Sequence, residues 1–119
     1  MSESLFVRLG GTEGVTRIAH DVVENHWANP IISKRFAAFD LDELKKGAAD
    51  FFITGTGGPS VYEGKDMIAT HKGMNINNDE FVAALEDAVA AMEKNNVGQR
   101  EKEEVLYILF SLKNEVIQQ

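Results

Sequence analysis

The chain has 119 residues, of which 44% are hydrophobic and 26% are charged, and its formal net charge is -7. This length and composition are typical of one compact domain, so we expect a single domain over residues 1–119. The sequence contains no cysteine. It therefore excludes disulfide bonds, thiolate zinc sites, iron–sulfur clusters and covalent cofactor attachment at a C-x-x-C-H motif.

The distribution of charge also excludes some partners. Lysines are scattered among acidic residues rather than clustered, so nucleic acid and an anionic membrane surface are not expected partners. The first four residues are polar and acidic, and the apolar runs are only a few residues long. We therefore expect neither a signal peptide nor a membrane-spanning helix, and a cytoplasmic protein.

The first long helix is expected after Gly10 and Gly11, with the hydroxyl of Thr12 as its N-terminal cap. Asn29 and Pro30 are expected to end it. Its apolar face has helical spacing and consists of Val15, Ile18, Ala19, Val22, Val23 and His26.

A second helix is expected to begin after Asp40, which can cap it, and to end in a glycine-rich stretch. Its expected inner face consists of Leu41, Leu44, Ala48, Phe51, Phe52 and Gly55. Residues 55–64 hold four of the ten glycines, so we expect an irregular connection there.

The second half of the chain predicts three more helices. A short one is expected near residues 65–72, a longer one is capped by residues 77–79, and residues 95–98 separate that helix from the last one. The expected inner faces are Phe81, Leu85, Ala88, Val89 and Met92 in the longer helix, and Val105, Ile108, Leu109, Leu112 and Val116 in the last. No segment alternates with period two, so the prediction is an all-α domain of about five helices.

Since the chain has no cysteine, a metal would need histidine, carboxylate or methionine ligands, and the three histidines are the side chains that titrate near neutral pH. His20 lies on the polar face of the first helix, where a solvated side chain is expected. His26 continues the apolar face beside Trp27, and a core or boundary histidine is the expected role. His71 shares one side of the short helix with Met67 and Met74, and periodicity alone leaves burial and metal ligation equally open.

Common catalytic motifs are absent from the sequence. It contains no G-x-S-x-G, P-loop lysine, H-E-x-x-H or EF-hand spacing. The glycines at 55, 57 and 58 precede a proline and follow no expected strand, which excludes a dinucleotide-binding fingerprint.

A known family accounts for the remaining pattern. Its motifs are Leu9-Gly10-Gly11, Phe36, Phe51-Phe52, Gly57-Gly58-Pro59, Tyr62-x-Gly64-x-x-Met67-x-x-x-His71, Ile76 and Phe81. From about residue 5 to residue 117, the chain resembles the group I truncated haemoglobins. The resemblance implies a shortened globin fold, a two-over-two helical sandwich in which a one-turn proximal helix follows a glycine-rich loop.

The resemblance also implies a cofactor site. His71 matches the residue that ligates haem iron, and without cysteine the implied cofactor is non-covalent haem b. Lys65 or Lys72 is a candidate partner for the haem propionates. The residues that match the haem pocket, with Phe36 on the haem face, are Val23, Phe36, Leu44, Ala48, Phe51, Tyr62, Met67, Met74, Ile76 and Phe81.

The chain departs from the family pattern on the distal side of the haem. Relatives that retain oxygen carry hydrogen-bond donors where this chain has Val23 and, on the second helix, Leu44, Gly47 and Ala48. A distal pocket without donors implies fast oxygen release, unless His26 or a lysine turns inward.

The expected function is reversible binding of a diatomic ligand, O2, NO or CO, and transport, storage and sensing are not distinguished. One alternative is an NO dioxygenase that receives electrons from a reductase. The other is a helical interaction module that keeps the globin fold without haem. A monomer or weak homodimer is expected.

Overall fold

The computed structural model describes residues 3–36, 39–62 and 76–117. Within these ranges the regular elements are α1 (Leu5–Arg8), α2 (Gly11–Ala28), the 3-10 helix η1 (Ser33–Phe36), α3 (Leu41–Gly55), α5 (Asn78–Lys94), α6 (Gln99–Ser111) and α7 (Lys113–Val116). The only β-type pairing among them is one isolated parallel bridge, between Ile76 and Ile117. The all-α prediction is therefore confirmed.

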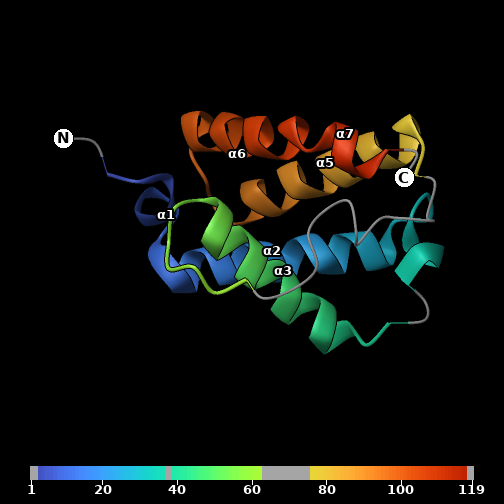
Figure 1. Ribbon diagram of the computed structural model, residues 1–119, viewed down its shortest axis with the longest axis horizontal. Helices are drawn as coiled ribbons and strands as arrows, with labels where there is room; N and C mark the ends of the chain where they lie inside the picture. The colour runs from blue at the N-terminus through green and yellow to red at the C-terminus, as the bar shows by residue number, and fades with distance from the viewer. Residues whose placement is uncertain (1–2, 37–38, 63–75, 118–119) are drawn as a thin grey trace.

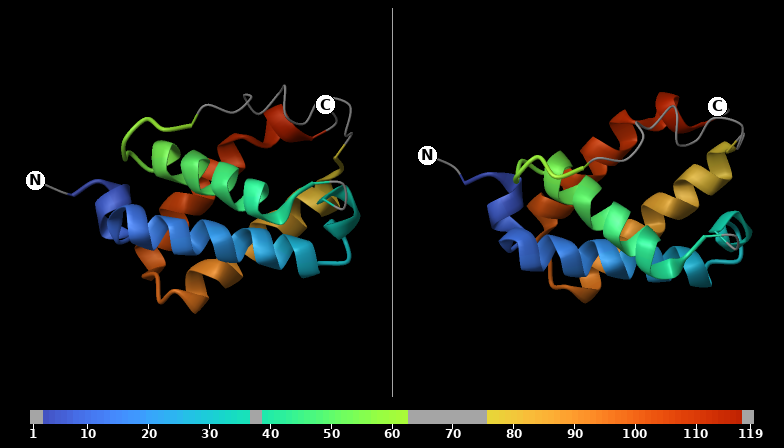
Figure 2. Two further views of the ribbon diagram at one scale, coloured as in Figure 1. Left: turned by 90° about the horizontal axis from the view of Figure 1, so that it is seen from below. Right: turned by 60° about the horizontal axis from the view of Figure 1, so that its bottom comes forward.

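The helices form two layers. α3 crosses α2 in one layer, and α5 and α6 lie side by side in the other (Figures 1 and 2). α2 also packs against α5, so it joins the two layers. This arrangement is the expected two-over-two sandwich.

The core lies along α2, α5 and α6. Val15 on α2 and Met92 on α5 are its largest fully buried side chains. The buried cluster consists of Leu5, Leu9, Val15, Ile18, Val22, Ile53, Ala88, Ala91, Met92 and Val105. The apolar face expected on the first long helix, Val15 to Val23, is buried as predicted.

The start of α2 differs from the expectation. The helix begins at Gly11 after Gly10, whose φ of 103° is left-handed and favours glycine, and no side chain caps it. Thr12 therefore lies inside the first turn and is exposed, so its prediction as the cap was wrong. A Cβ at Gly14 would lie 2.1 Å from the carbonyl oxygen of Leu9, so this turn and α2 approach too closely for any other residue.

The boundaries of α3 and α5 were predicted correctly. Asp40 caps α3 by accepting from the backbone N–H of Glu43 at 3.0 Å. Asn77 and Glu80 form a reciprocal capping box at the start of α5. α5 ends at a turn in which Asn96 has a φ of 58°.

The predicted inner face of α3 was partly wrong. Ala49 and Ile53 are its most buried residues, whereas Gly55 is exposed at its last turn. The reason is that Ile53 joins the buried cluster that includes residues of α2, while Leu44, Ala48, Phe51 and Phe52 of the predicted face border a cavity.

The ends of the chain contain helices that the periodicity did not resolve. The last predicted helix is divided into α6 and α7 at Leu112. α1 was not predicted; Ser4 caps it by accepting from the backbone N–H of Val7.

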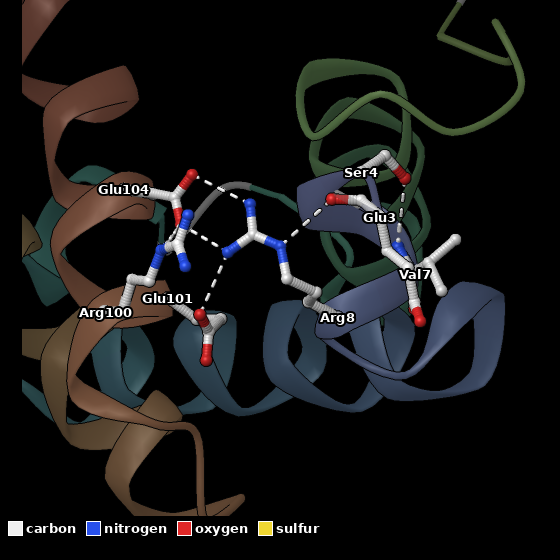
Figure 3. A network of polar contacts seen from close by, with 7 residues as sticks. All are labelled: Glu3, Ser4, Val7, Arg8, Arg100, Glu101 and Glu104. Carbon is white, nitrogen blue, oxygen red and sulfur yellow. Dashed lines mark hydrogen bonds and ion pairs between the residues drawn. The ribbon is translucent and has the colours of Figure 1, made fainter. Parts of the chain in front are cut away.

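A polar network joins α1 to α6 (Figure 3). Arg8 donates to Glu101 at 2.9 Å and binds Glu104 through both of its terminal nitrogens. Its Nε donates to the backbone carbonyl of Glu3. The hydrogen bond from Arg8 lowers the pKa of Glu104, and Glu104 in turn raises the pKa of Arg8.

Candidate functional site

A cavity of about 420 Å³ lies between the two helical layers. This volume is in the usual range for small-molecule and cofactor sites. The described residues that line it are Val22, Val23, His26, Phe36, Glu43, Leu44, Gly47, Ala48, Phe51, Phe52, Tyr62, Phe81, Ala84, Leu85, Ala88, Leu109 and Leu112. Most of these side chains are apolar, so the cavity favours an apolar occupant.

One wall of the cavity comes from α2 and α3. α2 contributes the buried Val22 and Val23. α3 contributes Leu44, Ala48 and Phe51 at helical spacing, together with Gly47, where no side chain covers the backbone. None of these side chains carries a hydrogen-bond donor.

Aromatic rings form a second part of the lining. The ring centroids of Phe51 and Tyr62 are 5.6 Å apart, and the rings meet edge to face at 76°. Phe51 meets Phe52 in a similar way at 5.8 Å. The backbone N–H groups of Val61 and Tyr62 both donate to Thr54 Oγ1 at 3.1 Å, which attaches the segment carrying Tyr62 to α3.

An ion pair positions η1, which carries Phe36 into the lining. Arg35 donates to Glu80 through Nε at 2.5 Å and through Nη2 at 2.8 Å. Because Glu80 belongs to the first turn of α5, the pair joins η1 to α5. The hydrogen bond from Arg35 lowers the pKa of Glu80.

His26 lies beside Phe36 in the lining. The two rings are stacked with centroids 5.6 Å apart and an angle of 7° between their planes. Nδ1 of His26 is 2.7 Å from Oδ2 of Asp87 on α5. Both oxygens of Asp87 also accept from Nδ2 of Asn29, at 3.1 and 3.2 Å.

Most of the expected pocket residues meet at this cavity. Those that line it are Val23, Phe36, Leu44, Ala48, Phe51, Tyr62 and Phe81. Ile76 is not among the described lining residues and instead forms the bridge to Ile117. The expected residues Lys65, Met67, His71, Lys72 and Met74 lie outside the described residues.

Sequence reasoning missed part of the lining. The cavity is also lined by Ala84 and Leu85 of α5, Leu109 of α6 and Leu112 between α6 and α7. From the sequence, Leu85, Leu109 and Leu112 were placed only on inner helix faces, and Ala84 was not assigned. Their apolar spacing was visible, but it does not separate a core contact from a cavity wall. His20 is half-buried rather than fully solvated.

The described residues contain no group of three or more His, Cys, Asp or Glu side chains that could hold a metal ion. In the same part of the chain, no helix combines the length and the hydropathy that crossing a membrane requires.

Comparisons with known proteins are consistent with one family. The model of the bacterial-like globins matches residues 4–118. A group 1 truncated hemoglobin of Tetrahymena pyriformis is 30% identical over 95 residues, which are 80% of this chain and 78% of the relative. A group 1 truncated hemoglobin of Chlamydomonas moewusii is 25% identical over 116 residues, 96% of this chain and 68% of the relative.

Solved structures agree with the arrangement of the helices. The truncated hemoglobin of Tetrahymena pyriformis in its Fe(III) form has a TM-score of 0.94 at 25% identity, covering 98% of this chain and 100% of its own. The 2/2 hemoglobin of Synechococcus sp. PCC 7002, solved in the cyanomet state with covalently attached heme, has a TM-score of 0.88 at 26% identity. The latter comparison covers 97% of this chain and 98% of the other.

Proposed function

This chain belongs to the bacterial-like globin family, whose truncated hemoglobins bind gases at haem, and from that premise we propose that it binds non-covalent haem b in the cavity between its helical layers. The observation that carries the proposal is the lining of the cavity, which is apolar and rich in aromatic side chains. Apolar burial is a main source of affinity for a porphyrin. The residues present therefore fit the group.

Described aromatic residues at two places in the lining support the proposed site. Phe36 and Phe81 offer flat apolar contacts at the end where η1 meets α5. Phe51 and Tyr62, joined edge to face, offer another. When bound, haem supplies an iron atom that can take a small gaseous ligand.

We propose His71 as the protein ligand of that iron. The support is the motif Tyr62-x-Gly64-x-x-Met67-x-x-x-His71, together with the membership of the chain in the family. Without cysteine, the axial haem ligand types that this sequence offers are histidine, methionine and tyrosine.

The proposed ligand is a diatomic gas that is released quickly. Val23, Leu44 and Ala48 line the cavity without a donor, and Gly47 has no side chain. The Nδ1 atom of His26 is already engaged by Asp87, which holds this ring at the wall. Because a hydrogen bond to a charged partner contributes about 1.5 to 3 kcal/mol, its absence corresponds to roughly one to two decades in the rate of oxygen release.

Titration of the purified chain with hemin tests the proposal. We expect a Soret band that saturates at one haem per chain and a strong loss of binding in His71→Ala. His20→Ala is the matched control, because His20 is not among the described residues that line the cavity. A chain that stays colourless with excess hemin would contradict the proposal.

The type of haem is tested by extraction. We expect acidified organic solvent to separate the haem completely from the loaded chain, because the sequence has no cysteine for thioether attachment. Haem that stays with the precipitated protein would instead indicate a covalent bond, as in the Synechococcus relative.

A further inference from the structure

His26 and Asp87 form a partly buried pair at the wall of the cavity. His26 belongs to α2 and Asp87 to α5, and the exposed fractions of their side chains are 16% and 13%. Nδ1 and Oδ2 are 2.7 Å apart, a short distance typical of a charge-assisted hydrogen bond. His26 is also one of the residues that line the cavity.

The surroundings of Asp87 determine which nitrogen of His26 carries the proton. The carboxylate accepts from Asn29 through both oxygens, and Nδ2 of Asn25 donates to the backbone carbonyl of Asp87 at 3.0 Å. Among the described residues, the partner of the carboxylate other than the ring is thus a donor, Nδ2 of Asn29, which fits an ionised acceptor. Nδ1 must then supply the proton, and in the neutral ring Nε2 holds the lone pair.

The lone pair on Nε2 is accessible. In the described part of the chain Nε2 has no hydrogen-bond partner, and no buried side-chain nitrogen or oxygen there lacks one. Nε2 is therefore not sealed inside the protein. Phe36 covers one face of the ring by stacking, and the side chain of His26 keeps an exposed fraction of 16%.

The other polar side chains in the described lining have different chemistry. Glu43 is an exposed carboxylate on α3, and Tyr62 is a phenol that is itself a weak acid. Of these groups in the described lining, only the ring of His26 offers a nitrogen lone pair with a carboxylate bound to its other nitrogen.

We propose that His26, positioned by Asp87, accepts the proton of a small weak acid HX that enters the cavity, so that the site favours protic ligands such as hydrogen cyanide or hydrogen sulfide. The H–X bond breaks, the proton moves to Nε2, and the electron pair stays on X, which becomes the anion. No electron is transferred to or from the protein. The inference rests on the proposed function, because ferric haem is the group that binds such anions.

The apolar lining and the base act together. A neutral HX enters an apolar cavity more easily than its anion does, because the anion loses more hydration. The ring that takes up the proton stays 2.7 Å from the carboxylate of Asp87 through Nδ1. O2 and CO carry no proton, so neutral His26 has nothing to accept from them.

The test compares a protic with an aprotic probe. We expect His26→Phe to slow the association of cyanide with the ferric haem protein at least tenfold, measured by stopped flow. Association of CO with the ferrous protein should change less than threefold. His26→Gln keeps a hydrogen-bonding side chain without the base and should behave like His26→Phe, and Asp87→Asn should also slow cyanide.

Asn25→Ala is the control for a purely structural role. It removes one link between α2 and α5 but leaves the His26–Asp87 contact in place, so the ratio of the cyanide and CO rates should stay as in the wild type. Equal slowing of both probes in the His26 variants, or full cyanide rates in them, would overturn the inference.

A second measurement does not depend on ligand kinetics. In the 15N-labelled chain without haem, we expect NMR spectroscopy to find the proton of neutral His26 on Nδ1. An Nε2–H tautomer would overturn the inference.

The outcomes separate this inference from the proposed function. Absence of a Soret band with hemin overturns the proposed function and this inference together. A normal Soret band with cyanide rates independent of His26 overturns the inference alone.

Discussion

At the scale of single residues, Gly14 has the closest backbone approach among the glycines that the structure describes. Its missing Cβ would lie 2.1 Å from a backbone oxygen, and a backbone atom cannot move aside as a flexible side chain can. Residue type at this position is thus set by the distance between α2 and the preceding turn, and not by the helical pattern.

We predict that Gly14→Ala lowers the free energy of unfolding by at least about 2 kcal/mol, because overpacking against backbone forces α2 away from Leu9. Gly55→Ala is the control, since a Cβ there has no neighbour within 4 Å. Urea denaturation followed by circular dichroism measures both. Equal stability of the two variants would show that the close approach is not maintained in solution.

Substitution of Val23 tests whether the lack of hydrogen-bond donors in the cavity wall sets the rate of oxygen release. Its side chain is 7% exposed and lines the cavity. We predict that Val23→Tyr slows oxygen dissociation from the ferrous haem protein by roughly 10- to 100-fold, because a hydroxyl donor is added. Val23→Phe adds the ring without the hydroxyl and should leave the rate near that of the wild type; matching rates in the two variants would refute the explanation.

At the scale of elements, separate polar contacts hold the helices around the cavity. Arg35–Glu80 joins η1 to α5, His26–Asp87 joins α2 to α5, and the two hydrogen bonds to Thr54 attach the segment after α3. These polar contacts, and not the apolar lining alone, hold the elements around the cavity in position.

The Arg35–Glu80 ion pair should make the stability of the folded chain depend on pH in the acidic range. Arg35 lowers the folded-state pKa of Glu80 below its ordinary value of 4.5. The ion pair therefore contributes its full share of the free energy of unfolding above about pH 4.5. This contribution is lost as the pH falls through the lower, folded-state pKa of Glu80. We predict that the wild type loses more stability than Arg35→Gln between pH 6 and pH 3.

Thermal unfolding at several pH values measures this difference. Lys46→Gln is the control, because it breaks a surface pair with Asp50 in which the lysine side chain is 81% exposed. Its pH dependence should match the wild type. A parallel pH profile for Arg35→Gln would show that the pair contributes nothing to acid sensitivity.

The elements also show the limits of sequence reasoning. Helix existence followed from apolar spacing, and the caps Asp40 and Asn77 followed from residue type. The start of α2 was not predicted correctly, because the left-handed Gly10 begins the helix before Thr12 can cap it. The break between α6 and α7 was not predicted, since the apolar stripe continues across Leu112.

At the scale of the whole molecule, the cavity is assembled from both helical layers. Its described lining draws on α2, α3, α5 and α6, so no single stretch of sequence contains it. Seven of the expected pocket residues line it, and they could be named from the sequence because the family resemblance matched each of them to a pocket position. The pair of His26 and Asp87 was not foreseen, because periodicity within α2 carries no information about a partner 61 residues away.

A ligand that bridges both layers should stabilise the whole fold. We predict that hemin at a free concentration of 100 times its Kd raises the unfolding midpoint by about 10 °C, since binding then contributes about 2.7 kcal/mol. Protoporphyrin IX without iron should give a smaller increase, because it keeps the apolar contacts and lacks the iron bond. Circular dichroism measures both, and an unchanged midpoint with hemin would contradict binding between the layers.

The attachment of residues 61 and 62 to Thr54 has a practical consequence. The backbone N–H of Phe6 donates to the carbonyl of Thr56, so both ends of the short segment between them are anchored. Pro59 and Ser60 are exposed between these anchors. An epitope or a fluorescent label inserted between Pro59 and Ser60 would be accessible at the surface, while the hydrogen bonds to Thr54 hold Tyr62 in the cavity lining.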